Sequence, residues 1–220
     1  MSDDDSMDFG DFSVSVVVTS PPWYENCFIV SHKKSGEAIV IDPGGDAPHI
    51  SAAVAKLGVK VKEILLTHGH PDHVGAVGEL QNLWKVPCRA HEDERSVVEQ
   101  APMMAAMFTG QPGPAIDACD YYSGQPIFEL GGATYHIEHT PGHTPGGVCY
   151  VFDGFVITGD TLFNHGVGRT DLPGGNEKQL VSSISNLLGK LSEDTVLFSG
   201  HGPDWTVGEA RGWWQMMIGG

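Results

Sequence analysis

The sequence predicts an α/β protein in which two β-sheets pack face to face and carry helices on their outer sides. Three observations lead to this class. Apolar segments of strand type alternate along the chain with segments that have helical spacing. The 220 residues and the 40% hydrophobic content suit one domain with a large buried core. Several expected strands run directly into glycine- or proline-containing turns that carry histidine or aspartate.

The first half of the chain is expected to form strands at 12–18, 26–31, 37–42, 61–67 and 86–91. The segment FSVSVVV, for example, alternates and is rich in β-branched residues, which favours a strand. A helix over 52–58 is expected to end at Gly58. Apolar residues at helical spacing indicate a second helix over 73–84, and an acidic, helix-like stretch begins at Glu92.

The second half is expected to form strands at 133–140, 146–152, 154–159 and 195–200, and a helix over 177–191. Residues 101–117 interrupt this pattern. Their MMAAMF segment (103–108) is either a flexible lid over a site, because methionine adapts to irregular ligands, or an amphipathic segment that closes the core. We expect residues 1–10 to form an acidic flexible tail and residues 11–220 to form the folded domain.

The charge of the chain limits its partners. The formal net charge is -16, from 12 Lys+Arg against 28 Asp+Glu. Such a surface repels phosphate backbones, so we expect no nucleic acid partner.

The acidic N-terminus lacks the basic region of a signal peptide and no long apolar run follows, which predicts a cytoplasmic protein without a membrane segment. The four dispersed cysteines fit buried, reduced thiols. The GWWQMM segment (212–217) is a packing cap or a dimer contact, so the protein is a monomer or a homodimer.

The segment THGHPDH (67–73) concentrates residues that bind metals. It holds His68, His70, Asp72 and His73 directly after an expected strand. Three more residues of this kind, His143, Asp160 and His201, follow in glycine-containing turns at the ends of other strands. Strand ends can bring such side chains together at one rim of a sheet. Seven candidate ligands exceed the four of one structural zinc ion and fit two ions that share a bridge. For the other six histidines, His139 included, we expect ordinary surface or packing roles.

The pattern HxHxDH, followed by single His, Asp and His residues, resembles the metallo-β-lactamase superfamily over about residues 12–205. This resemblance implies an αββα sandwich. It also implies that His68, His70 and His143 bind a first metal, that Asp72, His73 and His201 bind a second, and that Asp160 bridges the two. The segment IVIDPGGD (39–46) is similar to the family's early strand and loop, which makes Asp42 a hydrogen-bonding partner of a ligand histidine.

The segments at 159–176 and 199–210 resemble small glyoxalase II-type hydrolases, which cleave thioesters such as S-lactoylglutathione. An aspartate at position 160 disfavours a true β-lactamase, where Cys or Ser is typical. Only a short segment follows His201, so the helical domain with which full-length glyoxalase II binds glutathione is not expected. The resemblance implies zinc, and iron or manganese fit the same ligands. Asp72 and Asp160 are then the catalytic carboxylates, acting with a metal-bridging hydroxide on a small thioester or ester.

Other functions of the same superfamily stay open. Persulfide dioxygenases are similar in GHTPG and GRTD, and imply one iron held by His68, His143 and Asp160. Lactonases resemble the ligand set but usually carry a tyrosine where this chain has Phe163. A promiscuous esterase or phosphoesterase is a further alternative. The net charge opposes a nuclease, and the complete ligand set opposes a non-enzymatic relative.

Arg169 is the candidate residue for substrate binding. Its segment GVGRTDLP lies between two of the expected ligands. The guanidinium either binds an anionic group of the substrate or supports the loop through an ion pair with a carboxylate such as Asp171.

Overall fold

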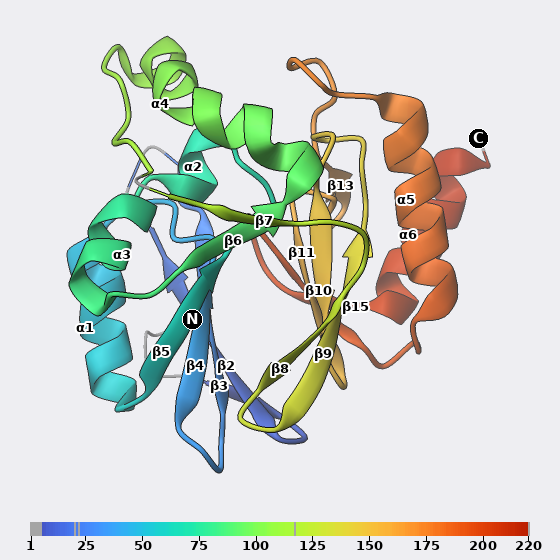
Figure 1. Cartoon of the computed structure of the whole chain (residues 1–220). Coiled ribbons are helices and arrows are strands. Elements are labelled where there is room, and N and C mark those ends of the chain that lie inside the picture. The colour runs from blue at the N-terminus through green and yellow to red at the C-terminus, as the bar shows by residue number, and fades with distance from the viewer. Residues whose placement is uncertain (1–5, 20, 22, 117, 220) are drawn as a thin grey trace.

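Two mixed β-sheets lie face to face at the centre of the computed structural model, which describes residues 6–19, 21, 23–116 and 118–219 (Figure 1). The first sheet has the strand order β1 (Met7–Phe9), β2 (Phe12–Val18), β3 (Asn26–His32), β4 (Glu37–Ile41), β5 (Lys60–Leu65), β6 (Cys88–His91) and β7 (Asp120–Tyr122). The second has the order β15 (Trp205–Thr206), β14 (Val196–Ser199), β11 (Phe155–Gly159), β10 (Val148–Val151), β9 (Ala133–His139) and β8 (Ile127–Leu130). A small ribbon pairs β12 (Leu162–Phe163) with β13 (Gly166–Val167).

Helices cover the outer faces of both sheets, as Figure 1 shows. The first sheet carries α1 (Ala47–Leu57), α2 (Pro71–Val74), α3 (Val77–Trp84) and α4 (Arg95–Thr109), the last preceded by a short 3-10 turn, η1 (Glu92–Glu94). The second sheet carries α5 (Glu177–Lys190) and α6 (Val207–Ile218). The architecture is therefore αββα, which confirms the predicted fold class.

Alternation along the strands builds separate apolar layers. In β4, Ile39 and Ile41 face the second sheet and pack into the core between the sheets. Their neighbours Ala38 and Val40 face the other way and pack under the helices of the first sheet. Successive side chains of a strand point to opposite faces, so a strand buried on both sides must be apolar throughout. This explains the continuous apolar character of β4.

The single helix expected over 73–84 is wrong, because the chain breaks between α2 and α3. The backbone N–H of Ala76 donates to the carbonyl of Pro43 at 2.9 Å instead of continuing the helix. Gly75 lies so close to the loop after β4 that a Cβ atom there would stand 2.3 Å from the Gly44 carbonyl oxygen. The break therefore docks the histidine segment onto the neighbouring loop.

Other boundaries also differ from the sequence prediction; for example, the helix expected over 52–58 begins earlier, at Ala47. Part of the acidic tail expected over residues 1–10 is instead ordered, because Met7–Phe9 pairs with β2 as an antiparallel strand and Phe9 packs against Phe155. Residues 1–5 of that segment lie outside the described residues. The interruption expected from residue 101 also comes later, since α4 continues through Pro102 to Thr109. Residue 117 of that segment is likewise outside the described residues.

The strand ends gather the candidate residues at one edge of the sandwich. β4 and β5 are parallel, and so are β11 and β14, so each pair of parallel strands ends on one side. Asp42, His68, Asp160 and His201 follow these four strands, and His143 lies in the turn between β9 and β10. The fold thus brings together residues that are far apart in the sequence. Among the described residues, no helix is long and apolar enough to cross a membrane.

Candidate metal centre

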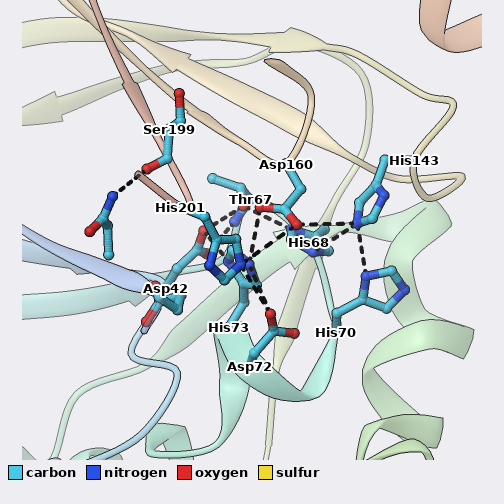
Figure 2. A network of polar contacts seen from close by, with 12 residues as sticks. Asp42, Thr67, His68, His70, Asp72, His73, His143, Asp160, Ser199 and His201 are labelled. Carbon is cyan, nitrogen blue, oxygen red and sulfur yellow. Dashed lines mark hydrogen bonds and ion pairs between the residues drawn. The ribbon is translucent and has the colours of Figure 1, made fainter. Parts of the chain in front are cut away.

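Three histidines meet at the first half of the site (Figure 2). The Nε2 atom of His143 lies 2.8 Å from Nδ1 of His70 and 3.3 Å from Nε2 of His68. All three side chains are buried, with at most 5% of each residue exposed. His68 and His70 come from the loop after β5, and His143 comes from the opposite sheet. These ring nitrogens form one group that could hold a metal ion.

Asp72, His73 and His201 form the second group. The Nε2 atom of His201 lies 3.1 Å from Oδ2 of Asp72, and Nε2 of His73 lies 3.8 Å from the same oxygen. Asp72 and His73 stand in the first turn of α2, so the short helix aims both side chains toward the second sheet.

Asp160 lies between the two groups. Its Oδ1 atom is 3.3 Å from Nε2 of His73, while Oδ2 is 3.7 Å from Nε2 of His143 and 3.9 Å from Nε2 of His201. One carboxylate therefore faces histidines of both groups. This is the position that the sequence assigns to a bridging ligand, and all seven predicted ligand residues lie together in the structure.

Residues around the cluster fix the orientation of its histidines. His73 Nδ1 donates to Oδ2 of Asp42 at 3.0 Å, and His143 Nδ1 donates to the Arg169 carbonyl at 2.7 Å. The Thr67 hydroxyl donates to Asp42 and lies 3.1 Å from Nδ1 of His68. Occupying Nδ1 in this way leaves Nε2 free to face the centre, which is the usual arrangement around metal-binding histidines. The contact predicted for Asp42 is therefore present.

Glu94 ties the two histidine loops of the first group together. Its buried carboxylate accepts from the backbone N–H of Gly69 at 2.9 Å and from that of Gly146 at 2.8 Å. Both glycines are in tight contact with the start of α4. A Cβ atom at Gly69 would lie 2.6 Å from the Val98 nitrogen, and one at Gly146 would lie 2.3 Å from the Glu94 nitrogen. The η1–α4 junction thus holds both loops at a fixed separation.

Asn26, at the start of β3, holds the loop that carries His201. Its side-chain amide donates to the carbonyls of Ser199 and Gly202, each at 2.9 Å. Its backbone N–H donates to the Gly200 carbonyl at 2.8 Å. These three bonds hold the backbone immediately before and immediately after His201. Neither Glu94 nor Asn26 was a candidate from the sequence, because neither stands in a recognisable motif.

The electrostatics of the first group favour neutral imidazoles. Burial lowers the pKa of His68 well below its ordinary value, and the neighbouring histidines lower it further. Burial, together with His143, lowers the pKa of His70 to about 3. Burial lowers the pKa of His143 as well. A neutral imidazole has a free lone pair, which is the form that binds a metal.

The electrostatics of the second group favour charged side chains instead. Burial opposes a charge on His73, but the carboxylates of Asp160 and Asp72 outweigh it and raise the pKa of His73 well above its ordinary value. Burial also opposes charge on both carboxylates, yet His73 keeps the pKa of Asp72 and that of Asp160 below their usual range. Two carboxylates with only 17% and 11% of their side chains exposed attract positive charge at this place, which a metal cation can supply in place of the proton.

Unsatisfied polar atoms show that the residues fit bound metal. His73 Nε2 and Asp160 Oδ1 are buried and have no hydrogen-bond partner. An unpaired buried polar group costs about 1–3 kcal/mol. His and Asp are both common ligands of divalent transition metals. The cluster therefore has the composition and the unmet polar atoms of a site for divalent metal.

A further His/Asp group lies apart from this centre. His91, Asp93 and His139 bring ligand atoms within 4.8 Å of one another. However, the rings of His91 and His139 are stacked, with centroids 4.3 Å apart and planes at 17°. Lone pairs in nearly parallel ring planes do not converge on one ion. His139 Nε2 instead contacts the Pro145 carbonyl at 3.0 Å. The sequence predicted an ordinary surface or packing role for both histidines.

A cavity with a volume of about 320 Å³ adjoins the cluster. It is lined by His70, Pro71, Asp72, His143 and Asp160 on the side of the cluster, and by Trp23, Met104, Phe108, Phe163, Val167, Arg169 and Leu172 around them. Met104 and Phe108 belong to α4, in the segment that the sequence indicated as either a lid or a core segment. They line the cavity, and Met103 and Met107 beside them are largely exposed.

Arg169 reaches the rim of this cavity but is already paired. Its Nε and Nη2 atoms donate to the two oxygens of Asp171 at 2.7 and 2.8 Å. Both side chains are more than half exposed. Its backbone carbonyl accepts the hydrogen bond from His143 described above. The loop-supporting alternative for Arg169 therefore has a direct structural basis.

Fold and cluster together define a class of protein: an αββα scaffold whose edge carries His/Asp groups for divalent metal. The sequence profile described as the metallo-beta-lactamase superfamily matches residues 20–201, well over half of the chain. The chain belongs to this superfamily, and metal-dependent hydrolysis is the general activity that this membership supports.

Three similar proteins illustrate the range of the family. Hydroxyacylglutathione hydrolase GloC of Haemophilus influenzae is 34% identical over 200 residues, covering 89% of this chain and 93% of that protein. The crystal structure of BLEG-1 B3 metallo-beta-lactamase is 33% identical, with a TM-score of 0.84, and covers 90% of this chain and 96% of that one. The structure of TTHA1623 in a di-iron-bound form is 34% identical, with a TM-score of 0.78. The similarity covers 89% of this chain and 96% of that one.

Proposed function

We propose that the protein is a dinuclear metal-dependent hydrolase that cleaves thioesters. The observation that carries this proposal is the position of Asp160, whose two oxygens face histidines of both groups. His68, His70 and His143 would hold the first ion, and Asp72, His73 and His201 the second. The similar structure of TTHA1623 is of a di-iron-bound form, which supports two ions in this chain as well. Zinc is the ion we expect, and iron or manganese suit the same ligands.

The chemistry follows from the residues around that centre. When bound, divalent ions supply a hydroxide nucleophile near neutral pH and polarise a carbonyl group. Asp72 lies at the floor of the cavity, 3.1 Å from His201, so its carboxylate can orient the nucleophile toward a bound acyl group.

A thioester suits this site because it needs little acid catalysis. A typical thiol has a pKa of about 8.5, so the thiolate leaves without a strong proton donor. Lysine is absent from the residues that line the cavity, and Arg169 there is paired with Asp171. The relative GloC is named a hydroxyacylglutathione hydrolase, which supports thioesters as the substrate class.

The proposal is tested with purified protein reconstituted with zinc, with S-lactoylglutathione as the first substrate. We expect metal-dependent release of the thiol. Asp72→Ala is expected to lower kcat by a factor of 100 or more, on the order seen for removal of an electrostatic catalytic group. Full turnover by Asp72→Ala with both ions still bound would show that Asp72 has no catalytic role. Oxygen uptake on glutathione persulfide, without thioester cleavage, would favour a mononuclear iron dioxygenase instead.

A further inference from the structure

The cavity beside the cluster has two chemically different sides. Its floor consists of the His and Asp side chains of the candidate metal centre. Its walls are apolar, formed by Trp23, Met104, Phe108, Phe163, Val167 and Leu172. A group held against these walls therefore occupies the same cavity as the candidate metal ligands.

The apolar walls are assembled from three separate parts of the chain. Trp23 comes from the loop before β3, and Phe108 comes from the last turn of α4. Their rings meet edge to face, with centroids 5.5 Å apart and planes at 80°. Phe163 lies across the cavity in β12, with its ring 6.0 Å from that of His201. Aromatic contacts of this geometry stabilise a preformed apolar surface.

The cavity is poorly suited to a charged peptide. Arg169 supplies the single guanidinium among the lining residues, and both of its donor groups facing Asp171 are already used. The formal net charge of the whole chain is -16. The glutathione part of a thioester carries two carboxylates, and burying them without a cationic partner is costly. The apolar walls are therefore better suited to the acyl group of a thioester than to its glutathione part.

We propose, building on the thioester hydrolase function above, that this cavity binds the acyl chain of the substrate and selects aliphatic or aromatic acyl groups. The substrates are then thioesters of apolar carboxylic acids, and the thiol part contributes little to recognition. With about 320 Å³, the cavity is at the lower end of the range for ligand pockets, so it fits a short or medium chain.

A second cavity, with a volume of about 310 Å³, adjoins the first. Trp23 and Pro71 line both cavities. The remaining lining of this second cavity includes Val74, Ala101 and Ala105, so it is also partly apolar. Trp23 thus forms part of the wall between the two spaces, and a smaller residue at this position would open one into the other.

The experiment compares two substrate series on the zinc-loaded protein. The first joins acetyl, butanoyl, hexanoyl and octanoyl groups to the same thiol, N-acetylcysteamine. Each buried methylene contributes about 0.8 kcal/mol, so kcat/KM should rise about fourfold per methylene until the cavity is full. The second series keeps the butanoyl group and changes the thiol from N-acetylcysteamine to glutathione. This change should alter kcat/KM less than one two-carbon step in the acyl series.

Matched variants place the effect in the cavity. Met104→Glu puts a charge on the apolar wall and should remove the gain from longer chains. Met103→Glu, on the same helix but 74% exposed and outside the cavity, should keep it. Trp23→Ala should move the best chain length upward, because it opens the second cavity.

Two results would overturn the inference. The first is a flat response to acyl length with active thioester cleavage, which would leave the proposed function intact. The second is a strong requirement for glutathione over N-acetylcysteamine. Absence of cleavage for every thioester, with metal bound, would instead refute the proposed function itself, and the inference with it. Circular dichroism of each variant confirms that a lost preference does not reflect unfolding.

Discussion

The Nδ1 atom of His73 lies 3.0 Å from Oδ2 of Asp42, and both side chains are completely buried. This bond connects the end of β4 to the second ligand group. It fixes the tautomer of His73, so that Nε2 faces Asp72 and Asp160. Asp42 adopts a positive φ of 51°, which is uncommon outside glycine, so the turn after β4 is held in a strained shape to make this contact.

The first prediction concerns this bond. Asp42→Asn keeps the size of the side chain but removes its charge. It also replaces one hydrogen-bond acceptor, a carboxylate oxygen, with a donor NH₂ group. We expect metal affinity to fall by about 10- to 100-fold, the range typical for partners of ligand histidines. Competition with a chromophoric chelator measures this. Asp171→Asn is the control, because Asp171 is exposed and bonded to Arg169. Equal affinities of Asp42→Asn and the unmodified protein would contradict the role of Asp42.

Glu94 gives the second prediction. In Glu94→Gln, an amide N–H group would face one of the two backbone donors, Gly69 or Gly146, and one bond is lost. We expect the two histidine loops to loosen, with about 10-fold weaker metal binding at the first group. Glu92→Gln, two residues away and exposed, is the matched control. The account of Glu94 fails if both variants bind metal alike and melt at the same temperature.

The third prediction tests the close contact at the η1–α4 junction. A Cβ atom at Gly146 would stand 2.3 Å from the Glu94 nitrogen, so Gly146→Ala must displace backbone. We expect it to lower the free energy of unfolding by about 1–3 kcal/mol, the usual cost of overpacking. Gly189→Ala in α5 meets nothing within 4 Å, so it should raise stability by about 0.5–1 kcal/mol. Denaturant titration of both variants gives the comparison, and equal effects of the two would refute the packing argument.

The fourth prediction is a pH dependence of the metal-free protein. Folding lowers the pKa of His70 from 6.5 to about 3. As the pH falls, His70 is therefore protonated in the unfolded chain before it is protonated in the folded one. The resulting contribution to stability is complete above about pH 6.5 and is lost as the pH falls toward 3. Between pH 7 and pH 5, His70 alone should cost about 2 kcal/mol of unfolding free energy. His73, whose pKa is raised, acts in the opposite direction.

His70→Gln separates this contribution from the others. In chelator-treated samples, the difference in unfolding free energy between the protein and His70→Gln should shrink on going from pH 7 to pH 5. A difference that stays constant would mean that His70 is not held neutral by the fold.

Much of the site could be predicted from the sequence because its ligands stand in recognisable settings. His68 to His73 form a contiguous motif, and His143, Asp160 and His201 each follow glycine in a turn. Strand alternation and apolar runs likewise predicted both sheets. The supporting contacts could not be predicted in this way. Glu94 and Asn26 reach backbone groups of loops distant in the sequence, and only the folded chain shows which loops these are.

The predicted boundaries of helices and strands were wrong where tertiary contacts override the local sequence pattern. The break between α2 and α3 exists because Ala76 bonds to Pro43, a partner that helical spacing alone does not reveal. Residues Met7–Phe9 form a strand because β2 offers them an edge and Phe155 offers Phe9 a partner. Acidic composition had suggested a tail there.

The proposed metal centre holds two metal ions in one cluster. Elemental analysis of the purified protein, with S-lactoylglutathione turnover measured on the same sample, tests it most directly. We expect two divalent ions per chain together with thioester cleavage, and about one ion per chain in His201→Ala. A single iron per chain, no cleavage, and oxygen uptake on glutathione persulfide would contradict it.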